Sequence, residues 1–381
     1  MLFKNNILYI VESGDDSLKK ALRLKRLWLL LFAPAALALS LISTYFPAFS
    51  EWYANHIYPV LSLSVNFVTS LVPFSIAEFI VYTLPLLALF FLIRFVIRLI
   101  RRRPNRGAAA VKGFINLICA AGVVYFLFVI SCGINYNRYT FAQTSGLQIQ
   151  PSSKAELTAL CNSLADEVNA FRTKVKIDQN GVMKLSNPNF TQTAKEAEAA
   201  YDKIHIQYPL LRAGYGAPKP VLASRLMSHA NITGIFFPFT FEANVNDNIP
   251  EYSIPVTMGH ELSHLRGYMR EDEANFIGYL ICENSGNPDF EYSGKMLAFI
   301  YASNALYDTD RDAAGQVYAR LSEGVQRDLN ANSAYWKQFE GPVAQVSSAV
   351  NDSYLKANRQ EDGVKSYGRM VDLLLAEYRA K

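Results

Sequence analysis

The stretch His260-Glu261-Leu262-Ser263-His264 decides the fold class of the part of the chain in which it lies. Residues four apart on a helix share one face, so the imidazoles of His260 and His264 can hold one metal ion. Glu261 follows the first histidine directly, and its carboxylate can take a proton from a water at an open coordination position. Because the chain has only five His, a chance match to this H-E-x-x-H pattern is on the order of one in a few hundred. The stretch therefore predicts a helix that carries a zinc site.

The residues that flank this helix support the prediction. Pro255 is suited to open the helix, and Gly267 is suited to end it in a left-handed conformation. A zinc site that keeps one position open for water needs a third protein ligand, and the acidic run after Gly267 offers both Glu271 and Glu273. A solvated acidic first turn of a helix would look the same. The residues alone leave the two carboxylates open as alternatives.

Three apolar runs in the first third of the chain are long enough to cross a bilayer. They cover residues 27–46, 76–100 and 114–134. Residues 57–75 are also apolar, but they contain Pro59 and Pro73, so we expect an interfacial or re-entrant segment there and not a fourth span. The sequence thus predicts an α-helical membrane anchor over residues 1–135, with three transmembrane helices in the lipid bilayer.

The basic residues of this anchor predict its orientation. Residues 1–135 hold 13 Lys or Arg against 5 Asp or Glu, and the basic residues cluster before the first run and between the second and third. The loop 47–75 has no Lys or Arg. The positive-inside rule then places the N-terminus and the loop 101–113 in the cytoplasm, and residues 136–381 outside the cytoplasmic membrane. Basic residues beside apolar runs form no stripe that would bind nucleic acid, so we expect no nucleic-acid partner.

Residues 136–381 are predicted to form a separate α+β domain in which helices dominate. Residues 151–176 and 191–207 have apolar residues at helical spacing. Residues 235–241 are aromatic and β-branched, and Pro238 inside them favours an edge strand, because a central strand would lose a ladder hydrogen bond there. The helical predictions and this strand define the α+β class.

Two of the four cysteines, Cys161 and Cys282, fall in the domain predicted to be exported. They could pair in an oxidising compartment, but two isolated cysteines carry no framework signal, so the disulfide stays open. The H-E-x-x-H stretch lies well over a hundred residues beyond the last apolar run, which disfavours proteolysis within the membrane.

Several motifs make the chain resemble a family of bacterial membrane proteins. They are Pro238-Phe-Thr-Phe-Glu-Ala-Asn-Val-Asn246, Gly259-His-Glu-Leu-Ser-His264, Arg270-Glu-Asp-Glu-Ala-Asn-Phe276 and Glu291-Tyr-Ser-Gly294. Together with the three apolar runs, they resemble the DUF3810 family over most of the chain. That family is named for unknown function and is assigned to metallopeptidases largely by the same motif.

The motifs also resemble the minimal core of gluzincin metallopeptidases, in which a Glu-x-x-Ala-Asp or Glu-x-x-Ala-Asn helix follows the H-E-x-x-H helix. The resemblance implies that Glu271 is the third zinc ligand and that Asn275 supports a zinc-bound histidine. It also implies a zincin-like domain in which an extended peptide pairs with the edge strand 233–246. The gap from His264 to Glu271 is shorter than in most gluzincins, which keeps Glu273 as the alternative ligand.

We therefore expect a membrane-anchored, zinc-dependent metallopeptidase that hydrolyses peptide bonds outside the cytoplasmic membrane, with Glu261 activating a zinc-bound water. Tyr292 and Tyr301 are candidates for the hydroxyl that stabilises the oxyanion, and Tyr292 is preferred. The alternative is a catalytically inactive zincin-like envelope protein that acts as a binding, assembly or sensing module. The retained Glu261 favours the enzyme, because a structural zinc site has no need of a base.

Overall fold

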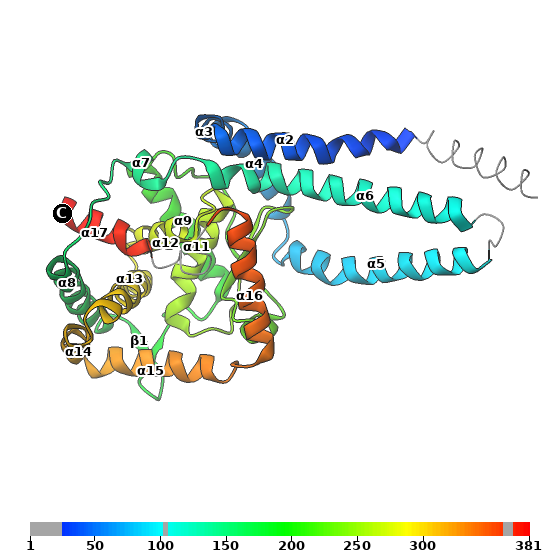
Figure 1. Ribbon diagram of the computed structural model, residues 1–381. Coiled ribbons are helices and arrows are strands. Elements are labelled where there is room, and N and C mark those ends of the chain that lie inside the picture. Colours follow the sequence, from blue (N-terminus) through cyan, green and yellow to red (C-terminus); the bar gives the residue numbers. More distant parts are fainter. Residues whose placement is uncertain (1–24, 102–105, 361–368) are drawn as a thin grey trace, which may run out of the picture.

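Long apolar helices project from one side of a mainly helical globular part in the computed structural model, which describes residues 25–101, 106–360 and 369–381 (Figure 1). These helices are η1 (Lys25–Leu31) continued by α2 (Phe32–Tyr45), α5 (Ile76–Arg101) and α6 (Arg106–Ser131). All three are long and apolar enough to cross a bilayer. The helix α6 begins before the predicted run 114–134 and ends at Ser131, and Ile134 beyond it is fully buried. The chain therefore leaves the third apolar helix slightly earlier than its composition indicates.

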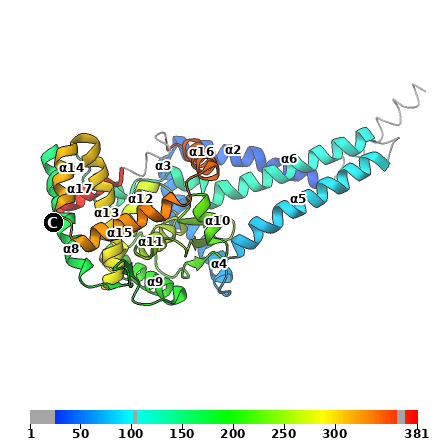
Figure 2. The ribbon, with the colours of Figure 1, turned by 90° about the horizontal axis from the view of Figure 1, so that it is seen from below.

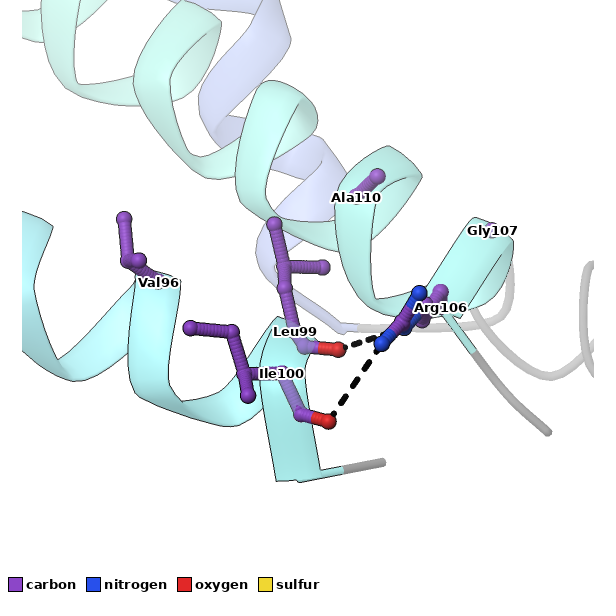
Figure 3. Close-up of a pocket in the computed structure, with 6 residues that line it drawn as sticks. All are labelled: Val96, Leu99, Ile100, Arg106, Gly107 and Ala110. Atoms are coloured by element: carbon purple, nitrogen blue, oxygen red, sulfur yellow. Dashed lines mark hydrogen bonds between the residues drawn. The ribbon is translucent and has the colours of Figure 1, made fainter. Parts of the chain in front are cut away.

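A hydrogen-bonded corner joins the far ends of α5 and α6 (Figure 3). Arg106 Nε donates to the carbonyl of Leu99 over 2.8 Å, and its Nη2 donates to the carbonyl of Ile100 over 3.5 Å. Carbonyls in the last turn of a helix lack intrahelical partners, and a cationic side chain also suits the negative end of the helix dipole. Val96 and Ala110 line the shallow apolar hollow between the two ends. This corner is a local structural device, far along the chain from the predicted zinc ligands.

The segment between the first two apolar helices packs onto the globular part. It forms α3 (Pro47–His56) and α4 (Tyr58–Thr69). Tyr58 donates to the carbonyl of Leu265 over 3.1 Å, and Asn66 Nδ2 donates to the carbonyl of Phe241 over 2.8 Å. The predicted boundary at residue 135 therefore does not separate the two parts, because α4, within the segment 57–75 predicted to be interfacial or re-entrant, packs on the globular part.

The globular part is otherwise built mainly from helices that follow α6 in the chain. They are η3 (Gly133–Asn137), α7 (Phe141–Ser145), α8 (Lys154–Arg172), α9 (Phe190–Gln207), α10 (Ser224–His229), η4 (Glu251–Ser253), α11 (Ile254–Leu265), α12 (Glu271–Glu283), α13 (Pro288–Thr309), α14 (Arg311–Ala319), α15 (Glu323–Lys337), α16 (Pro342–Ala357) and α17 (Met370–Ala380). The helix α8 falls within the predicted range 151–176, and α9 begins one residue before the predicted range 191–207 and ends with it. The C-terminus lies on the side opposite the apolar helices in both views (Figure 2).

The helix α11, which carries the H-E-x-x-H stretch, runs through the centre of the globular part. Every residue of α11 except His260 is buried. Gly259 on α11 faces Gly278 on α12, where a Cβ on Gly259 would lie 3.0 Å from the Cα of Gly278. Two glycines at the crossing let the backbones of α11 and α12 approach closely. This contact holds the first turn of α12 beside the histidine face of α11.

Two small sheets complete the fold. One pairs β1 (Lys176–Ile177) with β2 (Met183–Lys184), and the other has the order β3 (Lys219–Pro220), β5 (Glu242–Val245), β4 (Gly234–Phe237). The prediction of one edge strand over residues 233–246 is wrong in this respect: the segment is an antiparallel hairpin, and only β4 is an edge strand. Pro238 needs no ladder hydrogen bond because it lies in the hairpin turn, where Phe241 has a φ of 49°.

The two cysteines considered for a disulfide do not form one. Cys161 on α8 and Cys282 on α12 are both buried as separate thiols. Burial raises the pKa of the Cys161 thiol to about 12 and keeps it protonated. Both side chains therefore contribute apolar surface to the core.

Candidate metal centre

His260, His264 and Glu271 come together where α11 meets the first turn of α12. One nitrogen or oxygen from each lies within 4.8 Å of the others. The Oε2 atom of Glu271 is 3.3 Å from His260 Nε2 and 3.7 Å from His264 Nε2. The three side chains are only 10–14% exposed. The structure thus forms a small, nearly buried cluster with two imidazole nitrogens and one carboxylate oxygen facing each other.

Each imidazole is held through the nitrogen that faces away from the cluster. His264 Nδ1 lies 2.7 Å from the carbonyl oxygen of Tyr268, which can only accept a hydrogen bond. His260 Nδ1 lies 2.8 Å from Asn275 Oδ1. A proton on Nδ1 leaves the lone pair of the neutral ring on Nε2, the atom directed at Glu271. Both rings are therefore oriented as metal ligands usually are, with the second nitrogen donating to an oxygen.

The carbonyl of Tyr268 reaches His264 because the chain reverses at Gly267. The amide of Gly267 donates to the carbonyl of His264 over 2.9 Å, and the amide of Tyr268 donates to the carbonyl of Ser263 over 3.1 Å. These two bonds form a Schellman motif, which requires a left-handed residue, and Gly267 has a φ of 86°. The predicted glycine stop is confirmed. The tight turn also explains how Glu271 can follow His264 so closely and still face it.

Asn275 lies one helical turn after Glu271, as the sequence motif predicted, and is itself supported. Its Nδ2 donates to the hydroxyl of Tyr301 over 3.2 Å. This bond fixes the amide so that Oδ1 points at His260. Tyr301 on α13 was one of two tyrosines considered from sequence, and it is the one that the structure brings beside this cluster.

Glu261 is buried on the β4 side of α11. Its carboxylate lies so close to Gly234 that a Cβ there would be 2.5 Å from Oε1. Burial raises the pKa of Glu261, and the two neighbouring histidines and the backbone N–H of Phe236 only partly oppose this rise. Within the described residues its Oε2 has no hydrogen-bond partner. A buried carboxylate oxygen left without a partner is costly and is typical of a functional group.

The clustered side chains change each other's pKa. Burial lowers the pKa of His264, but the Glu271 carboxylate outweighs burial and raises the pKa to about 9. Burial would raise the pKa of Glu271, but the two imidazoles hold it well below its usual range. The carboxylate is therefore ionised, and the pocket suits a positive charge placed between the three groups.

Glu273, the alternative ligand, lies outside the cluster. Its Oε1 accepts a hydrogen bond from the backbone N–H of Phe141 over 2.8 Å and forms an ion pair with Arg270 over 3.0 Å. The carboxylate thereby ties α7 to the start of α12. The sequence could not separate the two glutamates, but the structure brings only Glu271 to the histidines.

Tyr292 is not part of the site, and its selection as the oxyanion-stabilising hydroxyl is wrong. It is fully buried, and its hydroxyl donates to Asp328 Oδ2 over 2.6 Å. Asp328 also accepts from Arg172 Nε over 2.6 Å and from the backbone N–H of Met183. This network joins α8, α13 and α15, so the Tyr292 hydroxyl serves the core.

Two further residues at the site, Gly234 and Gln360, were not identified from the sequence. Gly234 gives Glu261 its space, and Gln360 Oε1 accepts from the backbone N–H of Glu271 over 3.3 Å. Gln360 lies 89 positions after Glu271, so no local pattern links the two. The sequence shows Gly234 at the start of the β-rich segment, but it does not show that this glycine contacts Glu261, because that contact depends on how β4 packs on α11.

Comparison with known families identifies the chain. The family model described as "Protein of unknown function (DUF3810)" matches residues 53–375. The match covers most of the chain, so the protein belongs to the DUF3810 family. It includes the end of α3, the whole of α4, α5 and α6, and all the clustered side chains. Searches of curated proteins and of solved structures found no match.

Proposed function

We propose that this protein is a membrane-anchored zinc metallopeptidase with its site at the meeting of α11 and α12. The observation that carries the proposal is the joint arrangement of His260, His264 and Glu271 with the buried carboxylate of Glu261, whose Oε2 has no hydrogen-bond partner among the described residues. A structural site would have no use for a buried base next to the ligands. The proposal therefore concerns catalysis and not metal binding alone.

The three clustered side chains fit zinc. Ligand atoms at about 2.0–2.2 Å from a tetrahedral ion lie roughly 3.3–3.6 Å apart. The Glu271 oxygen is separated from the two Nε2 atoms by 3.3 and 3.7 Å. Two neutral imidazoles and one carboxylate are also a common catalytic zinc set with a fourth position for water. When bound, zinc would lower the pKa of a water molecule and polarise a carbonyl.

The protein's own groups supply the remaining chemistry. Glu261 accepts the proton of the attacking water and passes it to the amine that leaves. Its burial favours this proton-accepting role, because desolvation makes the carboxylate more basic. Asn275 and the Tyr268 carbonyl hold the two imidazoles in place throughout. Both hydrogen bonds are short and nearly buried, as the positioning of groups at a reaction site requires.

The edge strand β4 offers a place for an extended substrate. It is one of the two outer strands of its sheet, and Ile235 at its middle is 46% exposed. A polypeptide that adds to this edge by backbone hydrogen bonds would pass over Glu261, because Gly234 of β4 contacts that carboxylate. The proposed substrate is therefore a peptide segment in extended form.

The full-length protein in detergent or lipid tests this function directly. Purified protein should contain about one zinc per chain and should cleave members of a mixed peptide library. A chelator should abolish cleavage, and added zinc should restore it. Zinc without cleavage of any peptide would favour the non-catalytic binding, assembly or sensing module.

Gly234→Ala should lower turnover without removing zinc. The backbone at Gly234 is not left-handed, so alanine fits the chain, but its Cβ would lie 2.5 Å from Glu261 Oε1. Because a shift of about 1 Å in a catalytic group costs on the order of 100-fold, we expect kcat to fall about 10- to 100-fold. Gly315→Ala is the matched control, since nothing lies near a Cβ at Gly315. Unchanged turnover in Gly234→Ala, measured with equal zinc content, would contradict the assigned place of Glu261.

We also propose that the globular part lies outside the bacterial cytoplasmic membrane, with the N-terminus inside. The support is the cluster of basic residues at the end where α5 and α6 meet, against a loop 47–75 without Lys or Arg. A reporter fused after residue 107 should be active only in the cytoplasm, and one fused at the C-terminus only outside. The reverse pattern in this fusion assay would overturn the orientation.

A further inference from the structure

The helix α16 has an apolar face that the rest of the protein leaves uncovered. Val343, Val346 and Val350 are 59%, 64% and 64% exposed. They recur three and four residues apart, so they lie on one side of the helix, and Tyr354 continues the row. We call these three residues the valine stripe. Three β-branched apolar side chains in a row are unusual on a surface that faces water.

The other sides of α16 show that the stripe is not its packing face. Leu355, on a different side, is fully buried. Gln345 and Ser348 are exposed on the side opposite the stripe. The helix therefore has one side against the protein, one polar side and one exposed apolar side. A polar and an apolar side on one exposed helix are typical of a helix that lies in a membrane surface.

The position of α16 agrees with this pattern. It runs across the end of the globular part from which α5 and α6 project (Figures 1 and 2). The Tyr354 ring packs against Phe128 in the last part of α6, with centroids 6.3 Å apart. Its hydroxyl lies 3.7 Å from Cys132 Sγ, one residue beyond the end of α6. The row that includes the valine stripe thus begins at the end of a candidate membrane span.

A second exposed apolar group lies at the corresponding end of α5. Leu222, two residues before α10, and Leu226 within it are 80% and 65% exposed, and we refer to both as the leucines of α10. The backbone N–H of Leu222 donates to Glu78 Oε2 over 2.9 Å, and Glu78 lies in the first turn of α5. Glu242 at the start of β5 accepts from the backbone N–H of Ala77 over 2.8 Å. Both α10 and the β4–β5 hairpin are therefore fixed at the level where α5 begins.

We propose that the valine stripe of α16 and the leucines of α10 rest on the outer surface of the bilayer that α5 and α6 cross. The occupant of this face is the boundary between lipid headgroups and acyl chains. Apolar side chains on both sides of the spans, at the level of their ends, meet this boundary without any change in the fold.

The metal cluster then lies close to the membrane surface. Met269, two residues before Glu271, has its sulfur 3.6 Å from Cys132 Sγ at the end of α6. On the other side of the site, β4 runs from Gly234 beside Glu261 to Phe237 beside the hairpin turn. Three residue steps of a strand cover about 10 Å. The site is thus two residues from a contact with the end of α6 on one side, and one short strand from the hairpin turn on the other.

This position defines a substrate class, which rests on the proposed peptidase function. A polypeptide that emerges from the bilayer at the hairpin turn and follows β4 would bring a bond about three to five residues beyond its anchor to Glu261. The substrate is the juxtamembrane segment of a membrane-anchored polypeptide. A soluble peptide of the same sequence would meet the site only by free diffusion, without the gain in effective concentration that a shared membrane provides.

Fluorescence quenching tests the contact with lipid independently of catalysis. An environment-sensitive fluorophore is placed on Val346→Cys or on Gln345→Cys in full-length protein, in vesicles of phosphatidylethanolamine and phosphatidylglycerol. The unsubstituted chain, whose cysteines are buried, is the labelling blank. Lipids with a quencher near the headgroup should quench the label at position 346 several-fold more than the label at 345, which lies on the polar side. Equal quenching at both positions would overturn the membrane contact.

A pair of substrates tests the substrate class. One peptide sequence is supplied free, and the same sequence is tethered to the vesicle by a lipid anchor with a short linker. Wild-type protein should cleave the tethered peptide about tenfold or more faster. The double variant Val346→Glu/Val350→Glu should lose most of this preference and still cleave the free peptide at the wild-type rate. The control Gln345→Glu/Ser348→Glu carries the same added charge on the polar side and should keep the preference.

The outcomes separate the two proposals. A wild-type rate that is equal for free and tethered peptide overturns the substrate class and leaves the peptidase intact. Cleavage of neither peptide defeats the peptidase and with it the substrate class, while the quenching result alone then decides the membrane contact. Loss of cleavage of the free peptide in the valine variant would show that α16 supports the fold of the site and not its place on the membrane.

Discussion

Replacing Glu261 with Gln is expected to abolish peptide hydrolysis while the fold and the bound zinc remain. The carboxylate is not one of the three clustered ligand groups, and its Oε2 has no partner within the described residues. The amide is nearly isosteric, so it fills the space beside Gly234, but it cannot accept a proton at neutral pH. Loss of a general base typically lowers the rate by about 100- to 10,000-fold, so turnover should fall by at least about 100-fold.

The measurement pairs kcat on a cleavable peptide with zinc content and thermal unfolding of the same preparation. Glu323→Gln is a matched control, because it makes the same chemical change on the exposed first turn of α15. Hydrolysis that survives in Glu261→Gln would refute the assigned base. If neither wild type nor the variant cleaves any substrate while both hold zinc, the non-catalytic module becomes the better account.

Local sequence patterns predicted a large part of the fold and the site. The apolar runs marked three helices of membrane-spanning length because composition over about twenty residues is enough to detect them. Three features of the site could be predicted from neighbouring residues: the spacing of His260 and His264, the helix end at Gly267, and the spacing of Glu271 and Asn275. Each depends on helix periodicity or on the conformation of one residue, which neighbouring letters report directly.

The errors came from contacts between distant segments. Tyr292 was chosen among 22 Tyr, and its partner Asp328 lies on another helix. Residues 57–75 were predicted to be an interfacial or re-entrant segment because their apolar character is visible, whereas the groups on the globular part that pair with Asn66 and Tyr58 lie about two hundred residues away. Pro238 was assigned to a strand because a hairpin turn and an edge strand tolerate proline equally well. Periodicity cannot report such long-range partners.

Glu271→Ala should weaken zinc binding far more than Glu273→Ala. Only Glu271 places an oxygen within 3.3 Å of His260 Nε2 and 3.7 Å of His264 Nε2. Glu273 instead accepts from Phe141 and pairs with Arg270, so its loss should lower the free energy of unfolding by about 1–3 kcal/mol. Asn275→Ala should give an intermediate result, with zinc affinity reduced roughly 10–100-fold through the loss of support for His260.

Competition with a chelator of known affinity measures the zinc dissociation constant, and denaturant unfolding of the zinc-free proteins measures stability. The expected order of zinc affinity is wild type, Glu273→Ala, Asn275→Ala and then Glu271→Ala. The two measurements should rank the two glutamate variants in opposite order, because one carboxylate faces the cluster and the other ties α7 to α12. A Glu273→Ala protein that loses zinc beside a Glu271→Ala protein that keeps it would place the third ligand two residues later. In that case the first turn of α12 would have to rotate in the zinc-bound protein, which the close contact of Gly259 with Gly278 opposes.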